Sequence, residues 1–246
     1  MDRQFIEVAN QEAGEIVVIV PASLFNLRGD KPMPPRYPLI LIRHGQAEHH
    51  TKAITGGWTD SDLTETGIQQ ANRLGERLRQ ELGGPPTYLG CSHLRRAVHT
   101  AEIIGLWLET PLNVHHSLSD LNNGVAAGKT HAEARSYAIP PSQPIVDWQP
   151  YPQAESWRQF YHRVSKFMDK FSEGQEQPAV LVTHSATVHA IVAWWLKLPV
   201  DSRTHFEVAP GSVSVLRFNR WREHSIERLN DTAHLYALGL SNPIKL

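Results

Sequence analysis

The sequence predicts an α/β fold, a three-layer α/β/α sandwich built around a mostly parallel sheet. Short apolar runs, typical of buried strands, alternate along the chain with amphipathic segments of helical period. Alternation of strands and helices of these lengths indicates parallel βαβ units. The chain has 246 residues, 41% of them hydrophobic, which is enough to bury the core of one such domain.

Each expected element rests on its own local pattern. The expected strands are residues 37–42, 87–91, 113–118, 179–183 and 212–218. The expected helices are residues 64–82, 96–108, 155–171 and a last one that follows His184 and runs to about Lys197. The helix at 64–82 has apolar residues at offsets of three and four, and the Gly-Gly-Pro-Pro run after it ends it.

Two segments do not follow this alternation. Residues 1–36 hold a candidate strand at 15–20 and a proline-rich linker, so we expect an N-terminal extension followed by one domain over residues 37–246. Residues 136–154 contain five prolines and neither lysine nor arginine. We expect a loop there that packs against the domain through Ile145, Trp148 and Tyr151.

Composition excludes several classes of function. A formal net charge of -1 gives no electrostatic reason to expect nucleic acid or an anionic membrane as a partner. No apolar run approaches the roughly 18–20 residues of a membrane span. The single cysteine, Cys91, excludes an internal disulfide and favours a reducing compartment, so the cytoplasm is expected. Despite 14 histidines, the spacings typical of zinc sites are missing, and no metal is expected.

Polar residues with phosphate chemistry follow the expected strands. In open α/β sheets, ligands bind beyond the carboxyl ends of the strands. Arg43 and His44 follow the first strand, Arg96 follows the second, Asp120 the third and His184 the fourth. We therefore expect these side chains to meet at one rim of the sheet.

This set suits phosphoryl transfer without a metal or an organic cofactor. Arginine binds phosphate oxygens in a bidentate manner, and the helix that begins after His184 adds backbone N–H groups. An imidazole can attack phosphorus and form a covalent intermediate, and a carboxylate can protonate the leaving oxygen. Guanidinium and imidazolium groups supply the positive charge that Mg²⁺ supplies in other enzymes.

Several segments resemble the histidine phosphatase superfamily, in its phosphoglycerate mutase-like branch. They occur in the order of that family between about residues 37 and 235. The segments are 41–45 (LIRHG), 62–71 (DLTETGIQQA), 92–101 (SHLRRAVHTA), 155–156 (ES) and 181–184 (LVTH). Arg-His-Gly alone would be a weak signal, but several motifs in order after the expected strands are a strong one.

The resemblance implies a role for each residue. It implies that His44 is the nucleophile and that Arg43, Arg96 and His184 bind the transferring phosphoryl group. It places the proton donor at Asp120, where this branch more often has glutamate. It also implies that the substrate is a small phosphomonoester and that the fold is phosphoglycerate mutase-like.

The sequence departs from the family pattern at a few positions, and some roles stay open. His50 stands where an asparagine often helps to hold phosphate, so it is a candidate phosphate ligand. Gln46, Ala154 and Ser185 also replace the usual residues. Asp120 could instead be an ordinary turn residue, and Glu155 is then the reserve candidate for the acid.

Three functions remain, and the oligomeric state is undetermined. The first is a phosphomonoester hydrolase with a small or broad substrate range. The second is a phosphoglycerate mutase-type isomerase, and the third is a non-catalytic module that binds a phosphorylated ligand. Hydrolysis is favoured because a mutase needs cations for a second anion, and the loop at 136–154 offers none.

Overall fold

The computed structural model describes residues 37–86, 88–173, 177–202, 204–236 and 239. Its centre is a six-stranded sheet in the order β3-β2-β4-β1-β5-β6. The strands are β1 (Leu39–Arg43), β2 (Tyr88–Ser92), β3 (Leu112–His115), β4 (Ala179–Thr183), β5 (Val213–Phe218) and β6 (His224–Asp231). β3, β2, β4 and β1 run parallel, whereas β5 and β6 pair antiparallel at the other edge. The predicted α/β class with a mostly parallel sheet is confirmed.

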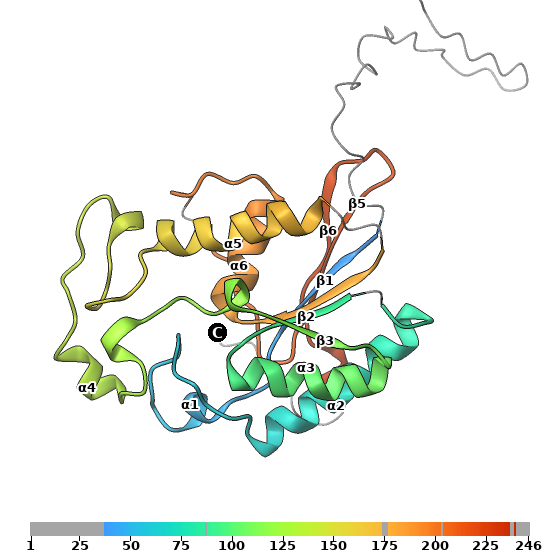
Figure 1. The fold of residues 1–246 in the computed structure, drawn as a ribbon, viewed down its shortest axis with the longest axis horizontal. Helices are drawn as coiled ribbons and strands as arrows, with labels where there is room; N and C mark the ends of the chain where they lie inside the picture. The colour runs from blue at the N-terminus through green and yellow to red at the C-terminus, as the bar shows by residue number, and fades with distance from the viewer. Residues whose placement is uncertain (1–36, 87, 174–176, 203, 237–238, 240–246) are drawn as a thin grey trace, which may run out of the picture. The chain divides into compact units, whose positions relative to one another are not determined.

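Helices cover both faces of this sheet (Figure 1). α2 (Glu65–Leu82) and α3 (Arg95–Leu108) pack together on one face, and α5 (Trp157–Ser172) and α6 (Ser185–Trp195) pack on the other. The short helices α1 (Glu48–Thr51), α4 (His131–Arg135) and α7 (Ala233–Tyr236) lie in the connections. Within the described residues, the arrangement is the three-layer sandwich that the alternation predicts.

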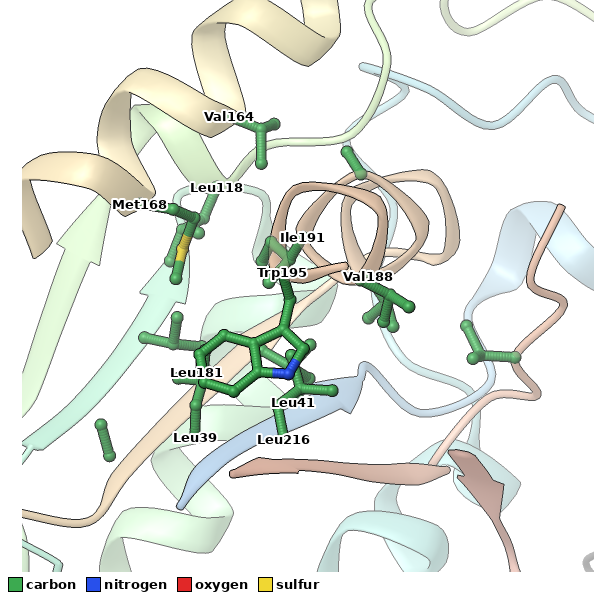
Figure 2. Packing of buried hydrophobic residues seen from close by; sticks show 14 of the residues in the cluster. Leu39, Leu41, Leu118, Val164, Met168, Leu181, Val188, Ile191, Trp195 and Leu216 are labelled. Carbon is green, nitrogen blue, oxygen red and sulfur yellow. The ribbon is translucent and has the colours of Figure 1, made fainter. Parts of the chain in front are cut away.

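Alternate residues of the central strands divide between two cores. Leu181 of β4 faces α5 and α6, while Val180 and Val182 face α2 and α3. Figure 2 shows the first core, where Trp195 of α6 lies over sheet residues that include Leu41. Both faces of β4 are therefore buried, as its uninterrupted apolar run predicts.

Most element boundaries agree with the sequence within one or two residues. Thr64 caps α2 by accepting a hydrogen bond from the Gly67 N–H, and Ser156 caps α5 in the same way, from Gln159. Both caps lie within the ranges expected to be helical, so these helices begin slightly later than predicted. β4 matches its predicted bounds.

Other predictions need correction. The third expected strand, 113–118, ends at His115, and His116–Leu118 form a 3₁₀ turn instead. In the loop at 136–154 the buried residues are Val146, at 6% exposure, and Ala154, at 3%, whereas Ile145 is 40% exposed. A 3₁₀ turn at Ile145–Asp147 causes this difference because it directs neighbouring side chains to different sides. The candidate strand at 15–20 lies outside the described residues.

No helix in the described part of the chain combines the length and the apolarity that crossing a bilayer would require.

Candidate active site

His44 lies where β1 ends, in a loop that the surrounding elements hold from several sides. Its backbone N–H bonds to Thr183 O of β4 at 2.9 Å. The next N–H, of Gly45, bonds to Thr100 Oγ1 of α3 at 3.2 Å. A Cβ on Gly45 would lie 2.5 Å from Gly67 O of α2, so only glycine permits this approach of loop and helix. The imidazole is 2% exposed.

Hydrogen bonds fix the tautomer of His44. Nδ1 lies 2.7 Å from its neighbour's carbonyl, Gly45 O, and Arg96 Nε donates to Nε2 at 3.1 Å. Because a carbonyl accepts and a guanidinium only donates, Nδ1 carries the hydrogen and Nε2 the lone pair. Burial, and then the charge of Arg96, hold the pKa of His44 well below its usual value. The ring is therefore neutral at neutral pH, and its Nε2 lone pair is directed at Arg96 in the pocket.

Arg96 enters the pocket from the first turn of α3 and is fully buried. Its two terminal nitrogens donate to the carbonyls of Thr59 at 2.6 Å and of Gly57 at 2.8 Å. One of them also lies 3.6 Å from Asp120 Oδ2. Burial lowers the pKa of this guanidinium, and Asp120 opposes that shift. Arg96 thus connects the histidine and the carboxylate that the sequence singled out.

Arg43, at the end of β1, donates to Val208 O at 2.6 Å, and its second terminal nitrogen lies 3.0 Å from His50 Nε2. Its buried Nε has no partner among the described residues. Burial lowers the pKa of Arg43 to about 10, so it remains charged at neutral pH.

His50 stands beside His44, with their rings stacked at a centroid distance of 5.6 Å. The Ala47 N–H donates to His50 Nδ1 at 3.1 Å, which leaves the hydrogen of the neutral ring on Nε2. Partial desolvation and the adjacent His49 lower the pKa of His50, which favours this neutral form. Nε2–H and the Arg43 guanidinium are then two neighbouring donors without an acceptor between them.

His184 follows β4 and is the N-cap residue of α6. Its ring is fully buried and lies 5.0 Å from that of His44, centroid to centroid. Ser92 Oγ, at the end of β2, bonds to His184 Nε2 at 2.7 Å, while Nδ1 is buried with no partner in the described chain. Burial lowers the pKa of His184 strongly, and Arg96 adds to this.

Asp120 follows the 3₁₀ turn after β3, and its side chain is 18% exposed. Its Oδ1 accepts the Leu121 N–H at 3.0 Å. Burial raises the pKa of the carboxyl, and the charge of Arg96 acts in the opposite direction. The result favours the protonated form beyond the pH range of an ordinary aspartate.

Glu155, the reserve candidate, has both carboxylate oxygens engaged. Arg163 donates to Oε1 at 2.8 Å and to Oε2 at 2.7 Å, and the Asn122 N–H also donates to Oε2. Glu155 is therefore paired with Arg163 of α5. Asp120, by contrast, has its carboxylate 3.6 Å from Arg96 of the pocket.

Two further residues belong to the site although motif reading did not select them. His49 is buried, bonds to Ser61 Oγ through Nδ1 at 2.7 Å, and lies 4.1 Å from the His50 ring, centroid to centroid. Ser92 is fully buried against His184. Ser92 is the last residue of β2, and the sequence rule places it at the same rim as His44 and His184, although without a role. His49 lies within α1, which the sequence did not predict.

The arrangement combines a neutral imidazole, several hydrogen-bond donors and a carboxyl whose pKa is raised. Two guanidinium groups and the buried, unpartnered Nε of Arg43 point to an anionic ligand, because buried donors without acceptors are costly. Among the described residues, no group of three or more His, Cys, Asp or Glu side chains could hold a metal ion. Chemically, the site can bind a phosphoryl group and transfer it to His44.

Comparison with known proteins gives the same family as the motifs. The model of the histidine phosphatase superfamily, branch 1, matches residues 39–232. The adenosylcobalamin/alpha-ribazole phosphatase of Salmonella typhimurium is 31% identical over 188 residues, which cover 72% of this chain and 89% of the relative.

One further relative has a different activity, and another similarity is to a solved structure. The 2,3-bisphosphoglycerate-dependent phosphoglycerate mutase of Bifidobacterium longum is 29% identical, over 63% of this chain and 76% of the mutase. The solved structure of Bacillus stearothermophilus YhfR superposes with a TM-score of 0.66 at 27% identity, covering 81% of this chain and 99% of the other.

Proposed function

Because this chain belongs to branch 1 of the histidine phosphatase superfamily, we propose that it hydrolyses phosphomonoesters through a phosphohistidine on His44. The observation that carries the proposal is the hydrogen bonding of His44. Nδ1–H is held by Gly45 O, and the Nε2 lone pair faces Arg96, so the ring has the tautomer that a nucleophile needs.

The first half-reaction transfers the phosphoryl group to the protein. His44 Nε2 forms a bond to phosphorus while the bond from phosphorus to the ester oxygen breaks. Asp120 gives its proton to that oxygen, and the alcohol leaves. In the second half-reaction water attacks phosphorus, its proton goes to the Asp120 carboxylate, and inorganic phosphate leaves with neutral His44 restored.

Four groups are proposed to hold the phosphoryl oxygens. Arg43 and Arg96 supply fixed positive charge, and the buried Nδ1 of His184 supplies a position that has no other partner in the described residues. His50 Nε2–H and the adjacent Arg43 nitrogen are both hydrogen-bond donors. A phosphate oxygen near them would accept a hydrogen bond from each. The N-terminus of α6 adds its partial positive charge.

Asp120 is the better candidate for the acid than Glu155. The pKa of Asp120 is raised by burial, and its carboxylate lies beside Arg96 of the pocket. Both carboxylate oxygens of Glu155 accept hydrogen bonds from Arg163, so neither is available to a leaving group in the pocket.

Small phosphomonoesters are the proposed substrates, and neither a metal nor a cofactor is required by this mechanism. The relatives named above are a phosphatase of alpha-ribazole compounds and a phosphoglycerate mutase, so the family admits different substrates. We keep the cytoplasm as the proposed location, residues 37–246 as the proposed domain, and no nucleic acid or membrane as partner.

Release of inorganic phosphate from p-nitrophenyl phosphate, with a metal chelator present, tests the proposed function. We expect turnover in the chelator, and we expect His44→Ala to lower it by several orders of magnitude while the circular dichroism spectrum stays unchanged. Rapid quenching of the wild-type protein should reveal one added phosphoryl group, which His44→Ala should lack. If His44→Ala retains more than a few per cent of the activity, the mechanism is wrong.

A further inference from the structure

The backbone of the segment that carries Asp120 is held by side chains from distant parts of the chain. Arg163 of α5 donates from one terminal nitrogen to Ser117 O at 3.1 Å and to Ser119 O at 3.2 Å. Its other terminal nitrogen donates to Asp120 O at 3.0 Å. One guanidinium therefore bonds to three carbonyls within four residues.

Glu155 orients this guanidinium. Its two oxygens accept from Nε and one terminal nitrogen of Arg163, the bidentate geometry that fixes the plane of the group. The same carboxylate accepts the Asn122 N–H at 3.0 Å. The ion pair thus contacts the chain on both sides of Asp120, before it through Arg163 and after it through Glu155.

Trp58, which precedes Asp120 in the sequence, holds the same backbone segment by a second hydrogen bond. Its indole Nε1–H donates to the carbonyl that Arg163 also bonds, Asp120 O, at 2.9 Å. The residues on either side, Gly57 and Thr59, accept hydrogen bonds from Arg96 through their carbonyls. One turn therefore fixes the position of Arg96 and of the backbone of Asp120 together.

We propose that Arg163, oriented by Glu155, and Trp58 are positioning residues that hold Asp120 at the distance required for proton donation. The proposal rests on the function proposed above. An aspartate carboxyl is separated from its backbone by a single methylene, so its place is set by the backbone more strictly than that of a glutamate. A displacement of about 1 Å can cost 10²-fold in rate, so these carbonyl bonds matter for the chemistry.

The test compares two substrates that differ in their need for an acid. An alkyl phosphate releases an alkoxide that must be protonated, whereas p-nitrophenyl phosphate releases a phenolate that is stable without a proton. The variants are Arg163→Met, which keeps an apolar stem against Phe160, and Trp58→Phe, which keeps an aromatic ring of smaller size and removes the indole N–H. The matched control is Arg158→Met, since Arg158 lies on the same helix and pairs with Asp147 at the surface.

We expect Arg163→Met to lower kcat for the alkyl phosphate by about 10- to 100-fold and that for p-nitrophenyl phosphate by less than about threefold. Trp58→Phe should show the same selectivity at about tenfold or less, the usual worth of one hydrogen bond. KM should change little in both variants because the phosphate ligands remain. Arg158→Met should change neither substrate.

Equal losses on both substrates would overturn the proposal and give these residues a purely structural role. If Arg163→Met does not fold, Trp58→Phe decides by the same criterion. In Trp58→Phe, which changes no charge, better hydration of Asp120 should also move the high-pH fall of alkyl phosphate turnover to lower pH. Failure of the proposed function itself would look different, because wild type and His44→Ala would then not differ on either substrate.

Discussion

Burial moves the pKa values of His44 and Asp120 in opposite directions, and each shift suits the role proposed for the residue. The same loss of water that keeps the imidazole neutral raises the pKa of the carboxyl, because desolvation penalises whichever form is charged. Arg96 touches both groups and acts differently on them. It lowers the pKa of His44 further and limits the rise for Asp120. A nucleophile and an acid can thus coexist at the same pH.

The proton donor can be tested by Asp120→Asn. Turnover of alkyl phosphates should fall by roughly 10²–10⁴-fold, the usual worth of a general acid, and that of p-nitrophenyl phosphate should fall less. Wild-type turnover of alkyl phosphates should also decline as pH rises through the raised pKa of Asp120, since the acid must be protonated. This decline should be missing from the pH profile of Asp120→Asn. Equal losses on both substrates would speak against an acid role and would direct the test to Glu155.

At the scale of elements, the His44 loop and the first turn of α2 approach each other through glycine on both sides. Gln46 O accepts the Thr64 N–H at 3.0 Å, and a Cβ on Gly67 would lie only 2.1 Å from the same oxygen. On the other side, Gly45 approaches Gly67 O. The helix therefore fixes the loop that carries His44 through backbone contacts that no larger residue permits.

Gly67→Ala should separate the loop from the helix. We expect a loss of about 1–3 kcal/mol in the free energy of unfolding, since backbone must move to accommodate the methyl group. We also expect turnover to fall by more than tenfold, because His44 would shift from its position. Chemical denaturation and p-nitrophenyl phosphate assays measure the two effects. Gly84→Ala is the control, since a Cβ there meets no atom within 4 Å; a similar loss in that variant would refute the explanation.

Sequence pattern predicted the elements whose burial is uniform or follows a regular period, and it missed those whose burial does neither. β4 was predicted to the residue because all five of its positions are buried. β6 was not predicted because it is an edge strand without a buried residue, in which only Ile226 and Leu229 are apolar. β3 was predicted too long because the pattern continues into Leu118, which is buried from a 3₁₀ turn. Local pattern records burial, and it does not record which backbone geometry produces that burial.

At the scale of the whole molecule, the strand order assembles the site from residues far apart in the sequence. β1 and β2 flank β4 in the sheet, so His44, His184 and Ser92 emerge from three adjacent strand ends. The rule for open α/β sheets predicted this convergence from the sequence. The contacts of Trp58 and Arg163 with Asp120 were not predictable, because each joins a side chain to a backbone carbonyl across more than forty residues. Such contacts leave no local pattern.

The distribution of cations along the chain favours a hydrolase over a mutase. A mutase must hold a second anion of the substrate, and the cations for it would come from the stretch between Asp120 and His184. The basic residues in the first part of that stretch are Lys129, His131 and Arg135. Lys129 lies over the ring of Tyr137 at 5.0 Å from its centroid, and the loop at 136–154 contributes neither lysine nor arginine. Arg163 farther along that stretch is occupied by Glu155. A second anion would therefore be poorly paired, and water is the expected acceptor of the phosphoryl group.

We therefore expect net release of inorganic phosphate and negligible interconversion of 3- and 2-phosphoglycerate, even when the bisphosphate primer is supplied. Both rates can be followed in one reaction by phosphorus NMR, with a known phosphoglycerate mutase added at the end to show that interconversion is detectable. The mutase relative from Bifidobacterium longum makes the comparison necessary, since identity of 29% does not separate the two activities. Interconversion faster than phosphate release would make this chain a mutase, with His44 returning its phosphoryl group to substrate before water can reach it.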